Sequence, residues 1–167
     1  GAPTRWRGEI GFYFDAGVAQ KEAVMAPCSV MIARAIDGEK IHEKGRGHLI
    51  CTDGTEHSLD SMRRDAVLAH FGGYPITLLC VARYQDDIAT AARVLEQSSE
   101  ILRKLEIPVE GTRIVVGDPA EEIVKVGKDF AVIVISDSRK MWIQRFFISG
   151  VALKVMGEAP TSVLNVR

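Results

Sequence analysis

The fold of this chain is decided by the stretch TRIVVGDPAEEIVKVGKDFAVIVIS, residues 112–136. Apolar runs rich in β-branched residues stand at its two ends, at Thr112–Val116 and Ala131–Ile135, and each predicts a strand. Between them Gly117-Asp118 marks a turn, and a helix is expected from about Pro119 through Val126 because proline suits the first helical turn. Strand, helix and strand in this order predict one crossover unit of a parallel sheet.

The same alternation continues outward in both directions. Ile76–Arg83 is a near-continuous apolar run, which is typical of a strand buried on both faces of a parallel sheet. Further strands are expected at His48–Thr52 and Ser162–Arg167, and helices from Leu59 to about Phe71 with Ser58 as N-cap, from Asp86 to Glu106, and from Arg139 to Met156. The chain therefore predicts an α/β domain with a five-stranded, mainly parallel sheet that has helices on both faces.

The end of this domain occurs twice in the sequence. Ala16–Arg34 reads AGVAQKEAVMAPCSVMIAR and Ser149–Arg167 reads SGVALKVMGEAPTSVLNVR, with nine of nineteen positions identical where composition predicts about one by chance. The polar stretch Ala35–Gly47 separates the two copies. We therefore expect residues 1–34 to be the closing helix and strand of a preceding repeat, residues 35–47 a linker, and residues 48–167 one complete domain, so that the chain is a fragment of a tandem protein.

Composition narrows the class of protein. The 167 residues are 47% hydrophobic and 26% charged with a net charge of -1, which is typical of a soluble globular domain and unfavourable for binding nucleic acid or an anionic membrane. No apolar run approaches a membrane span and the first residues do not resemble a signal peptide, so we expect a cytoplasmic location. Cys28, Cys51 and Cys80 lack metal-ligand spacing and are expected to be reduced thiols, and no metal site is expected from the four histidines.

Ligands of parallel α/β sheets bind at the carboxyl ends of the strands. In this chain we expect Asp53, Gly117 and the loop from Ser136 to Arg139 to lie at that edge. The acidic pairs Asp86-Asp87 and Glu121-Glu122 each open a helix, where they offset the helix dipole rather than form a catalytic pair. No catalytic residue is expected.

These landmarks resemble the universal stress protein family over essentially all of His48–Arg167. The most specific part is VGDPAEEIVKVGKDFAVIVIS followed by SGVALKVMGEAPTSVLNVR, and the opening strand that ends in Asp53–Glu56 also matches. The resemblance implies a strand order of 3-2-1-4-5. It also implies dimers or tandem pairs that join through their fifth strands.

Family members that bind ATP carry Gly-x2-Gly-x9-Gly-Ser/Thr after the fourth strand, because glycine lets backbone N–H groups approach phosphate oxygens. Here the three glycine positions fall at Ser136, Arg139 and Ser149, and the hydroxyl position falls at Gly150. Every element is substituted, so no cofactor is expected, although ATP or AMP stays possible. The resemblance places Asp53 beside the adenosine and Gly117 in the loop that lines the ribose.

Simpler explanations exist for the residues of this degenerate site. An aspartate after a strand commonly caps the next turn, and a glycine before Asp-Pro commonly supplies a turn conformation. Arg139, with Lys140 and Arg145, offers positive charge in place of the glycines, but a solvated basic face is the preferred explanation of these side chains.

Three functions remain open at this point. The first is a non-catalytic regulatory or stress-response module that has lost ATP binding and acts through dimerisation or assembly. The second is an adenine-nucleotide-binding switch with slow or no hydrolysis, and the third is the cytosolic regulatory tail of a larger protein such as a transporter.

The N-terminal piece yields a structural prediction. Cys28–Arg34 is an apolar strand that would expose an unpaired backbone edge if it stayed in water. We therefore expect Ser29–Arg34 to pair beside Ser162–Arg167, in the same chain or in a second copy, and Gly8–Met25 to form a helix near that junction.

Overall fold

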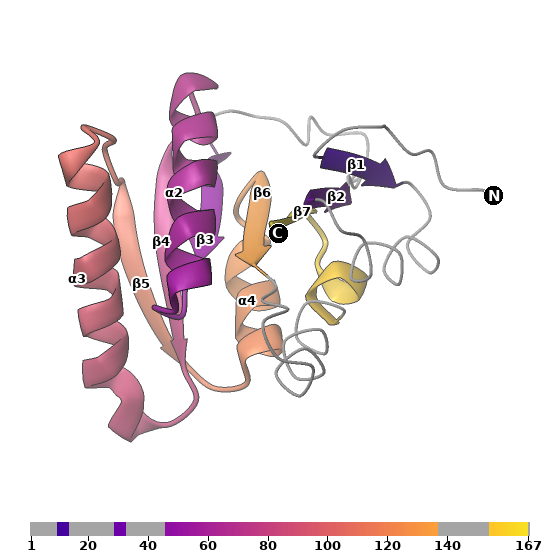
Figure 1. The fold of residues 1–167 in the computed structure, drawn as a ribbon. Coiled ribbons are helices and arrows are strands. Elements are labelled where there is room, and N and C mark those ends of the chain that lie inside the picture. Colours follow the sequence, from indigo (N-terminus) through magenta and orange to yellow (C-terminus); the bar gives the residue numbers. More distant parts are fainter. Residues whose placement is uncertain (1–9, 14–28, 33–45, 137–153, 167) are drawn as a thin grey trace.

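The computed structural model describes residues 10–13, 29–32, 46–136 and 154–166 (Figure 1). Seven strands form one sheet in the order β1-β2-β7-β6-β3-β4-β5. The strands are β1 (Ile10–Tyr13), β2 (Ser29–Ile32), β3 (His48–Cys51), β4 (Ile76–Ala82), β5 (Gly111–Val116), β6 (Val132–Ser136) and β7 (Ser162–Val166). The helices are α2 (Glu56–Phe71), α3 (Ile88–Lys104) and α4 (Pro119–Gly127), with a short 3₁₀ turn η2 (Gln85–Asp87) before α3.

Within the group of five strands from β3 to β7, every neighbouring pair is parallel. Numbered within this domain, their order is 3-2-1-4-5, which confirms the predicted fold class. The chain builds β4 and β5 on one side of β3 and then returns to build β6 and β7 on the other side. Because the direction of winding reverses there, the switch point of the sheet lies between β3 and β6.

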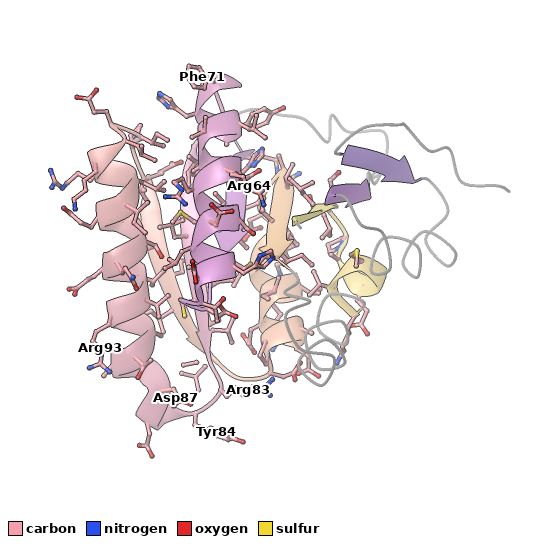
Figure 2. The ribbon with its side chains drawn as sticks, viewed as in Figure 1. Arg64, Phe71, Arg83, Tyr84, Asp87 and Arg93 are labelled. Carbon is pink, nitrogen blue, oxygen red and sulfur yellow. The ribbon has the colours of Figure 1, made fainter. Side chains whose placement is uncertain are left out.

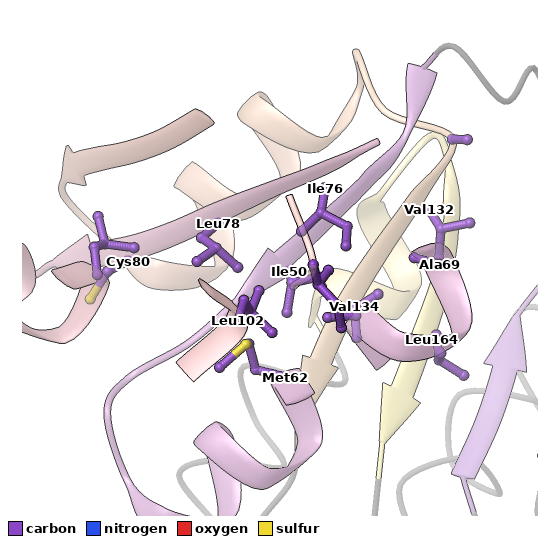
Figure 3. Close-up of a cluster of buried hydrophobic side chains, with 14 of the residues drawn as sticks. Ile50, Met62, Ala69, Ile76, Leu78, Cys80, Leu102, Val132, Val134 and Leu164 are labelled. Atoms are coloured by element: carbon purple, nitrogen blue, oxygen red, sulfur yellow. The ribbon is translucent and has the colours of Figure 1, made fainter. Parts of the chain in front are cut away.

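Helices cover both faces of this sheet. On one face Met62 and Ala66 of α2 and Leu95 and Leu102 of α3 pack against strand side chains such as Val134, and this cluster is drawn in Figure 3. On the other face α4 and residues 154–159 pack on a second cluster of buried side chains: Leu49, Leu79, Ala120, Ile123, Phe130, Ile133, Ile135, Val155, Met156, Ala159 and Val163. Alternate residues of β6 thus enter opposite clusters, as expected for a central strand.

Most predicted elements are confirmed with small shifts at their ends. The helix expected from Leu59 begins earlier, at Glu56, because Thr55 and not Ser58 is its N-cap: the Thr55 side chain accepts a hydrogen bond from the Ser58 backbone N–H. Of the helix expected at Arg139–Met156, only residues 154–156 are described; they are helical, and the helix continues to residue 158.

The N-terminal piece is confirmed in one respect and corrected in another. β2 pairs antiparallel with β7 within the same chain, as predicted for Ser29–Arg34 and Ser162–Arg167. The predicted helix over Gly8–Met25 is wrong at Ile10–Tyr13, which forms β1 and pairs parallel with β2. The apolar run IGFY can adopt an extended conformation because its backbone N–H and C=O groups find hydrogen-bond partners in the neighbouring strand β2. Residues 14–25 of that helix and the linker 35–45 lie outside the described residues.

The end of the linker is fixed to the domain. Arg46 donates from its guanidinium to the backbone carbonyls of Lys128 and Asp129, which follow α4. The Gly47 carbonyl accepts from the N–H of Ala131, and its φ of 72° would strain any other residue. The domain of residues 48–167 is therefore anchored at its first strand by the residues just before it.

Candidate functional site

The topology brings the predicted site residues to one edge of the sheet. Asp53 follows β3 and Ser136 ends β6, and these two neighbouring strands flank the switch point. Gly117 follows β5, two strands away from β3 on the same edge. Arg139, Ser149 and Gly150 lie outside the described residues. In Figure 2 this edge is the lower one, where Arg83, Tyr84 and Asp87 project after β4, while Phe71 marks the opposite edge.

Asp53 forms the turn that leads into α2. Its Oδ1 atom accepts from the backbone N–H of Thr55 at 2.9 Å and from the Thr55 hydroxyl at 2.7 Å. The Asp53 backbone N–H donates to the Ser58 hydroxyl oxygen at 3.0 Å. The turn-forming explanation of Asp53 therefore has direct geometric support. The side chain is nonetheless exposed at the carboxyl edge, where a ligand could reach it.

A small buried hydroxyl pair holds this loop, and the sequence reasoning missed it. The Thr52 and Ser58 hydroxyl oxygens lie 3.0 Å apart in the interior, and the Gly54 N–H reaches the Thr52 oxygen at 3.4 Å. Both residues are nearly inaccessible to solvent. The available signal was the polar Thr52 at the end of an apolar strand, six residues before another hydroxyl side chain. The pair fixes the position of Asp53 relative to β3.

Gly117 occupies a backbone conformation that requires glycine. Its φ is 150°, and a Cβ placed there would meet the Glu122 side chain at 3.0 Å. Asp118 then caps α4 by accepting from the Glu121 N–H at 3.1 Å. The turn explanation of Gly117 is therefore also supported, and the Glu122 carboxylate stands beside the same loop.

The described part of this edge is predominantly acidic. Two basic side chains near it are already engaged with α4: Lys154 lies 3.6 Å from Glu121 Oε1 and 4.0 Å from Asp118 Oδ2, and Lys125 bonds Glu122 Oε1 at 3.3 Å. The acidic residues of the loops and first helical turns here are Asp53, Glu56, Asp86, Asp87, Asp118, Glu121 and Glu122, beside a single arginine, Arg83, in those segments. This charge disfavours a polyphosphate.

The thiols below this edge are poorly suited to nucleophilic chemistry. Burial raises the pKa of the Cys80 thiol to about 11, and the negative charge of Asp53 acts in the same direction. Burial also raises the pKa of Cys51, with Cys80 as a smaller cause. Within the described residues, no three His, Cys, Asp or Glu side chains form a group that could hold a metal ion.

A separate depression of about 390 Å³ lies along α2 and contains none of the predicted site residues. It is lined by Glu56, His57, Leu59, Asp60, Arg63 and Ile101. Arg63 bonds Asp60 at 2.8 Å, and the His57 Nε2 atom is buried without a hydrogen-bond partner among the described residues. An atom that solvent cannot reach is not available to a ligand either, so the depression offers little recognition chemistry.

None of the helices among the described residues is sufficiently long and apolar to cross a bilayer.

Comparison with solved structures supports the fold. A universal stress protein from Archaeoglobus fulgidus matches with a TM-score of 0.68 and 14% identity, over 95% of this chain and 60% of that one. A universal stress protein of Pseudomonas aeruginosa matches with a TM-score of 0.66 and 16% identity, over 94% of this chain and 62% of the other. The chain thus spans about three fifths of the length of these two proteins.

A shorter solved protein matches a smaller share of this chain. The universal stress protein from Archaeoglobus fulgidus in complex with dAMP has a TM-score of 0.59 and 21% identity, over 72% of this chain and 97% of that one. Comparison with curated protein sequences gives no significant match.

The family assignment rests on the sequence itself. The model of the universal stress protein family matches residues 48–167, which is the whole segment from β3 to β7 together with the loops of the carboxyl edge. The parallel sheet in the order 3-2-1-4-5 and the solved structures above agree with this match. The chain therefore belongs to the universal stress protein family.

Proposed function

We propose that this chain is a non-catalytic regulatory or stress-response module of the universal stress protein type. Its β3–β7 domain does not bind ATP at cellular concentrations, and it acts through assembly at the β7 edge of the sheet. The observation that carries this proposal is the pairing of β2 with β7, because it extends the sheet past the fifth strand of the family domain.

The pairing also supports a tandem arrangement. β1 lies parallel to β2 just as β6 lies parallel to β7, and β2 and β7 are antiparallel. An approximate two-fold axis through the β2–β7 ladder thus relates the strand pair β1–β2 to the strand pair β6–β7. In this proposal residues 1–34 derive from a preceding repeat, and the β2–β7 ladder is the contact that two whole copies make through their fifth strands.

The chemistry of the carboxyl edge supports the loss of ATP binding. The three glycine positions of the phosphate motif hold Ser136, Arg139 and Ser149, and the described part of the edge is acidic. Charge-assisted hydrogen bonds to phosphate contribute roughly 1.5–3 kcal/mol each, so the loss of two weakens binding by a hundredfold or more. The residues present do not fit a triphosphate.

Titration calorimetry with ATP tests this part of the proposal. We expect no measurable binding up to millimolar ATP, and a shift of the thermal midpoint of less than about 1 °C, because a ligand present well below its Kd stabilises a protein by only a few tenths of a kcal/mol. The Archaeoglobus fulgidus protein that was solved in complex with dAMP, titrated with dAMP, serves as the positive control for detecting nucleotide binding. Micromolar affinity for ATP in this chain would overturn the proposal.

One alternative is favoured by a specific observation. Asp53 and Gly117 lie on the same edge, and a relative of the same fold was solved in complex with dAMP. A monophosphate needs fewer phosphate contacts than ATP, so an AMP-binding switch is the second candidate. AMP binding that is lost in Asp53→Ala and kept in Asp86→Ala, an acidic residue of the same edge, would favour this alternative.

A further inference from the structure

Exposed apolar side chains gather at two ends of the molecule. Among the described residues, the large hydrophobic side chains that remain exposed are Leu68, Phe71, Tyr84, Ile88 and Leu105. Because α2 and α3 each connect two neighbouring parallel strands, both helices begin at the carboxyl edge of the sheet and end at the opposite edge. Leu68, Phe71 and Leu105 therefore lie toward the opposite edge, and Figure 2 shows Phe71 and Tyr84 at the two ends. Apolar side chains that gather in this way indicate surfaces that a partner covers.

The surface at the end of α2 combines apolar side chains with positive charge. Leu68 and Phe71 are 60% and 85% exposed, and their spacing of three residues places them on one face of the helix with Arg64. Asp60 Oδ1 lies 2.8 Å from the Arg63 guanidinium and Asp60 Oδ2 lies 3.4 Å from that of Arg64. Two guanidinium groups thus share one carboxylate, which leaves this face with net positive charge. Arg64, Leu68 and Phe71 are here named the α2 patch.

The surface at the start of α3 combines apolar side chains with negative charge. Tyr84 is 71% exposed and Ile88 is 36% exposed. Asp86 and Asp87 stand between them, and neither carboxylate has a hydrogen-bond or ion-pair partner among the described residues. Arg83, just before Tyr84, balances one of these two charges, so the turn stays negative. Tyr84, Ile88 and the two aspartates are here named the η2 patch.

We propose that the α2 patch of one molecule binds the η2 patch of a second copy of this chain, head to tail. Phe71 and Tyr84 are the aromatic anchors of this contact, since large apolar side chains contribute most to an interface. Arg64 of one copy faces the aspartates of the other and sets the orientation. The inference goes beyond the proposed function, because it involves neither the β7 edge nor a nucleotide.

The two patches match in charge, but they lie at opposite ends and so cannot meet within one molecule. Contact between two α2 patches would place arginine against arginine, and contact between two η2 patches would place aspartate against aspartate. Of the three arrangements, the head-to-tail contact alone brings opposite charges together while it covers apolar surface on both sides. Charge complementarity therefore identifies a second copy as the partner of each patch.

A head-to-tail contact has consequences for the size of the assembly. Each molecule in it uses a different surface on either side, so every bound copy leaves one patch open for the next. Assembly then continues until a ring closes or a filament forms. The patches are small beside a standard protein interface, so association should appear only in concentrated protein. Salt should weaken it because exposed charges orient the contact.

Two variants and their mixture test the contact. Phe71→Ala removes the anchor of the α2 patch and Tyr84→Ala that of the η2 patch, and both side chains are exposed enough for the fold to tolerate the change. Sedimentation velocity follows the average mass at low salt from about 10 μM to about 1 mM protein, the range in which small contacts form. The parent should gain mass with concentration, and each variant alone should stay monomeric. An equimolar mixture retains one intact contact per pair, so it should form dimers that grow no further.

Charge reversal tests the orientation of the contact. Arg64→Glu and Asp87→Arg should each weaken association, because each brings like charges together. Mixed in equal amounts they should associate again, because each reversed charge then meets the other. Gln97→Ala is the matched control for the alanine variants, since this exposed residue lies in the middle of α3 and outside both patches. It should associate like the parent.

Three results would overturn the proposal. One is a parent that stays monomeric at about 1 mM, and another is a pair of alanine variants that associate like the parent. The third is a mixture of Phe71→Ala and Tyr84→Ala that stays monomeric, because it would show that the two patches do not bind each other. Association through the β7 edge does not involve these side chains, so it cannot produce the expected pattern.

Discussion

At the scale of single residues, a hydrogen-bonded pair in the interior links α2 to the first strand of the domain. His48 Nδ1 lies 3.0 Å from Asp65 Oδ2, and the Asp65 side chain is 1% exposed. The His48 ring also packs against Tyr74, with the ring centres 4.9 Å apart. The pair joins the start of β3 to the middle of α2. Removing either side chain therefore leaves the other without this hydrogen bond.

Removing one partner of this pair should cost more than removing both. In His48→Ala the Asp65 carboxyl group stays buried without this hydrogen bond, and we expect the free energy of unfolding to fall by about 1–3 kcal/mol. The double variant His48→Ala/Asp65→Leu should recover part of this loss because it also removes the unsatisfied buried group. Urea denaturation measures both. A loss of less than 1 kcal/mol in the single variant would show that the pair does not stabilise the fold.

The Cys80 thiol predicts how stability changes at alkaline pH. Its pKa is about 11 in the folded protein, against 9.0 for an unperturbed thiol. The unfolded chain therefore loses this proton at lower pH than the folded chain. The free energy of unfolding is unaffected below about pH 8 and falls as the pH rises from about 9 to about 11, by roughly 2–3 kcal/mol.

Comparison with Cys80→Ala isolates this contribution, since lysine and tyrosine also titrate in the same range. The parent should lose more stability than the variant between pH 8 and pH 10.5 in urea titrations. Parallel pH profiles for the two proteins would contradict the assignment.

At the scale of elements, β6 is the strand on which both cores depend. Ile133 and Ile135 enter one buried cluster and Val132 and Val134 enter the other. β6 also separates β3 from β7, so it connects the switch point to the strand that pairs with β2. A defect in this strand should therefore affect the whole domain.

Replacing Ile133 by Asp should abolish soluble folding. The side chain is fully buried, and an unpaired buried carboxylate costs several kcal/mol against a total stability of about 5–15 kcal/mol. Ile133→Val is the matched control and should cost only about 0.5–1.5 kcal/mol. Expression, gel filtration and thermal melts measure the outcome. A soluble Ile133→Asp variant that melts cooperatively would be incompatible with this place in the core.

At the scale of the whole molecule, the N-terminal strands β1 and β2 protect a sheet edge. β2 covers the outer side of β7, which would otherwise present unpaired backbone N–H and C=O groups. The two strands thus extend the five-stranded sheet to seven strands, and β1 is the outermost strand among the described residues.

Deleting residues 1–40 should uncover β7 and change the association of the protein. We expect either a dimer or reduced solubility, because an open edge of Ser162–Val166 can pair with another chain. Light scattering and thermal melts of the truncated and full chains provide the measurement. An unchanged and equally stable monomer would mean that β2 contributes little to protecting this edge.

Sequence by itself determined the α/β class, the five parallel strands and the approximate limits of the helices from Glu56 to Gly127. These follow from local signals: apolar runs, the proline and acidic residues that open α4, and the glycines that follow α2. The repeated segment also predicted the pairing of β2 with β7, because an apolar strand without neighbours needs a partner edge.

Only the tertiary structure decided the features that depend on which segments meet. The extended conformation of Ile10–Tyr13 is set by the neighbouring β2, since four apolar residues suit either a helix or a strand until a ladder supplies hydrogen-bond partners. The His48–Asp65 pair joins residues that no sequence spacing connects, and the burial of the Thr52–Ser58 hydroxyl pair depends on how α2 packs on the sheet. At the carboxyl edge the sequence located Asp53 and Gly117 and explained both by local turns, but the order of the strands in the sheet decides which strands bring them to one edge.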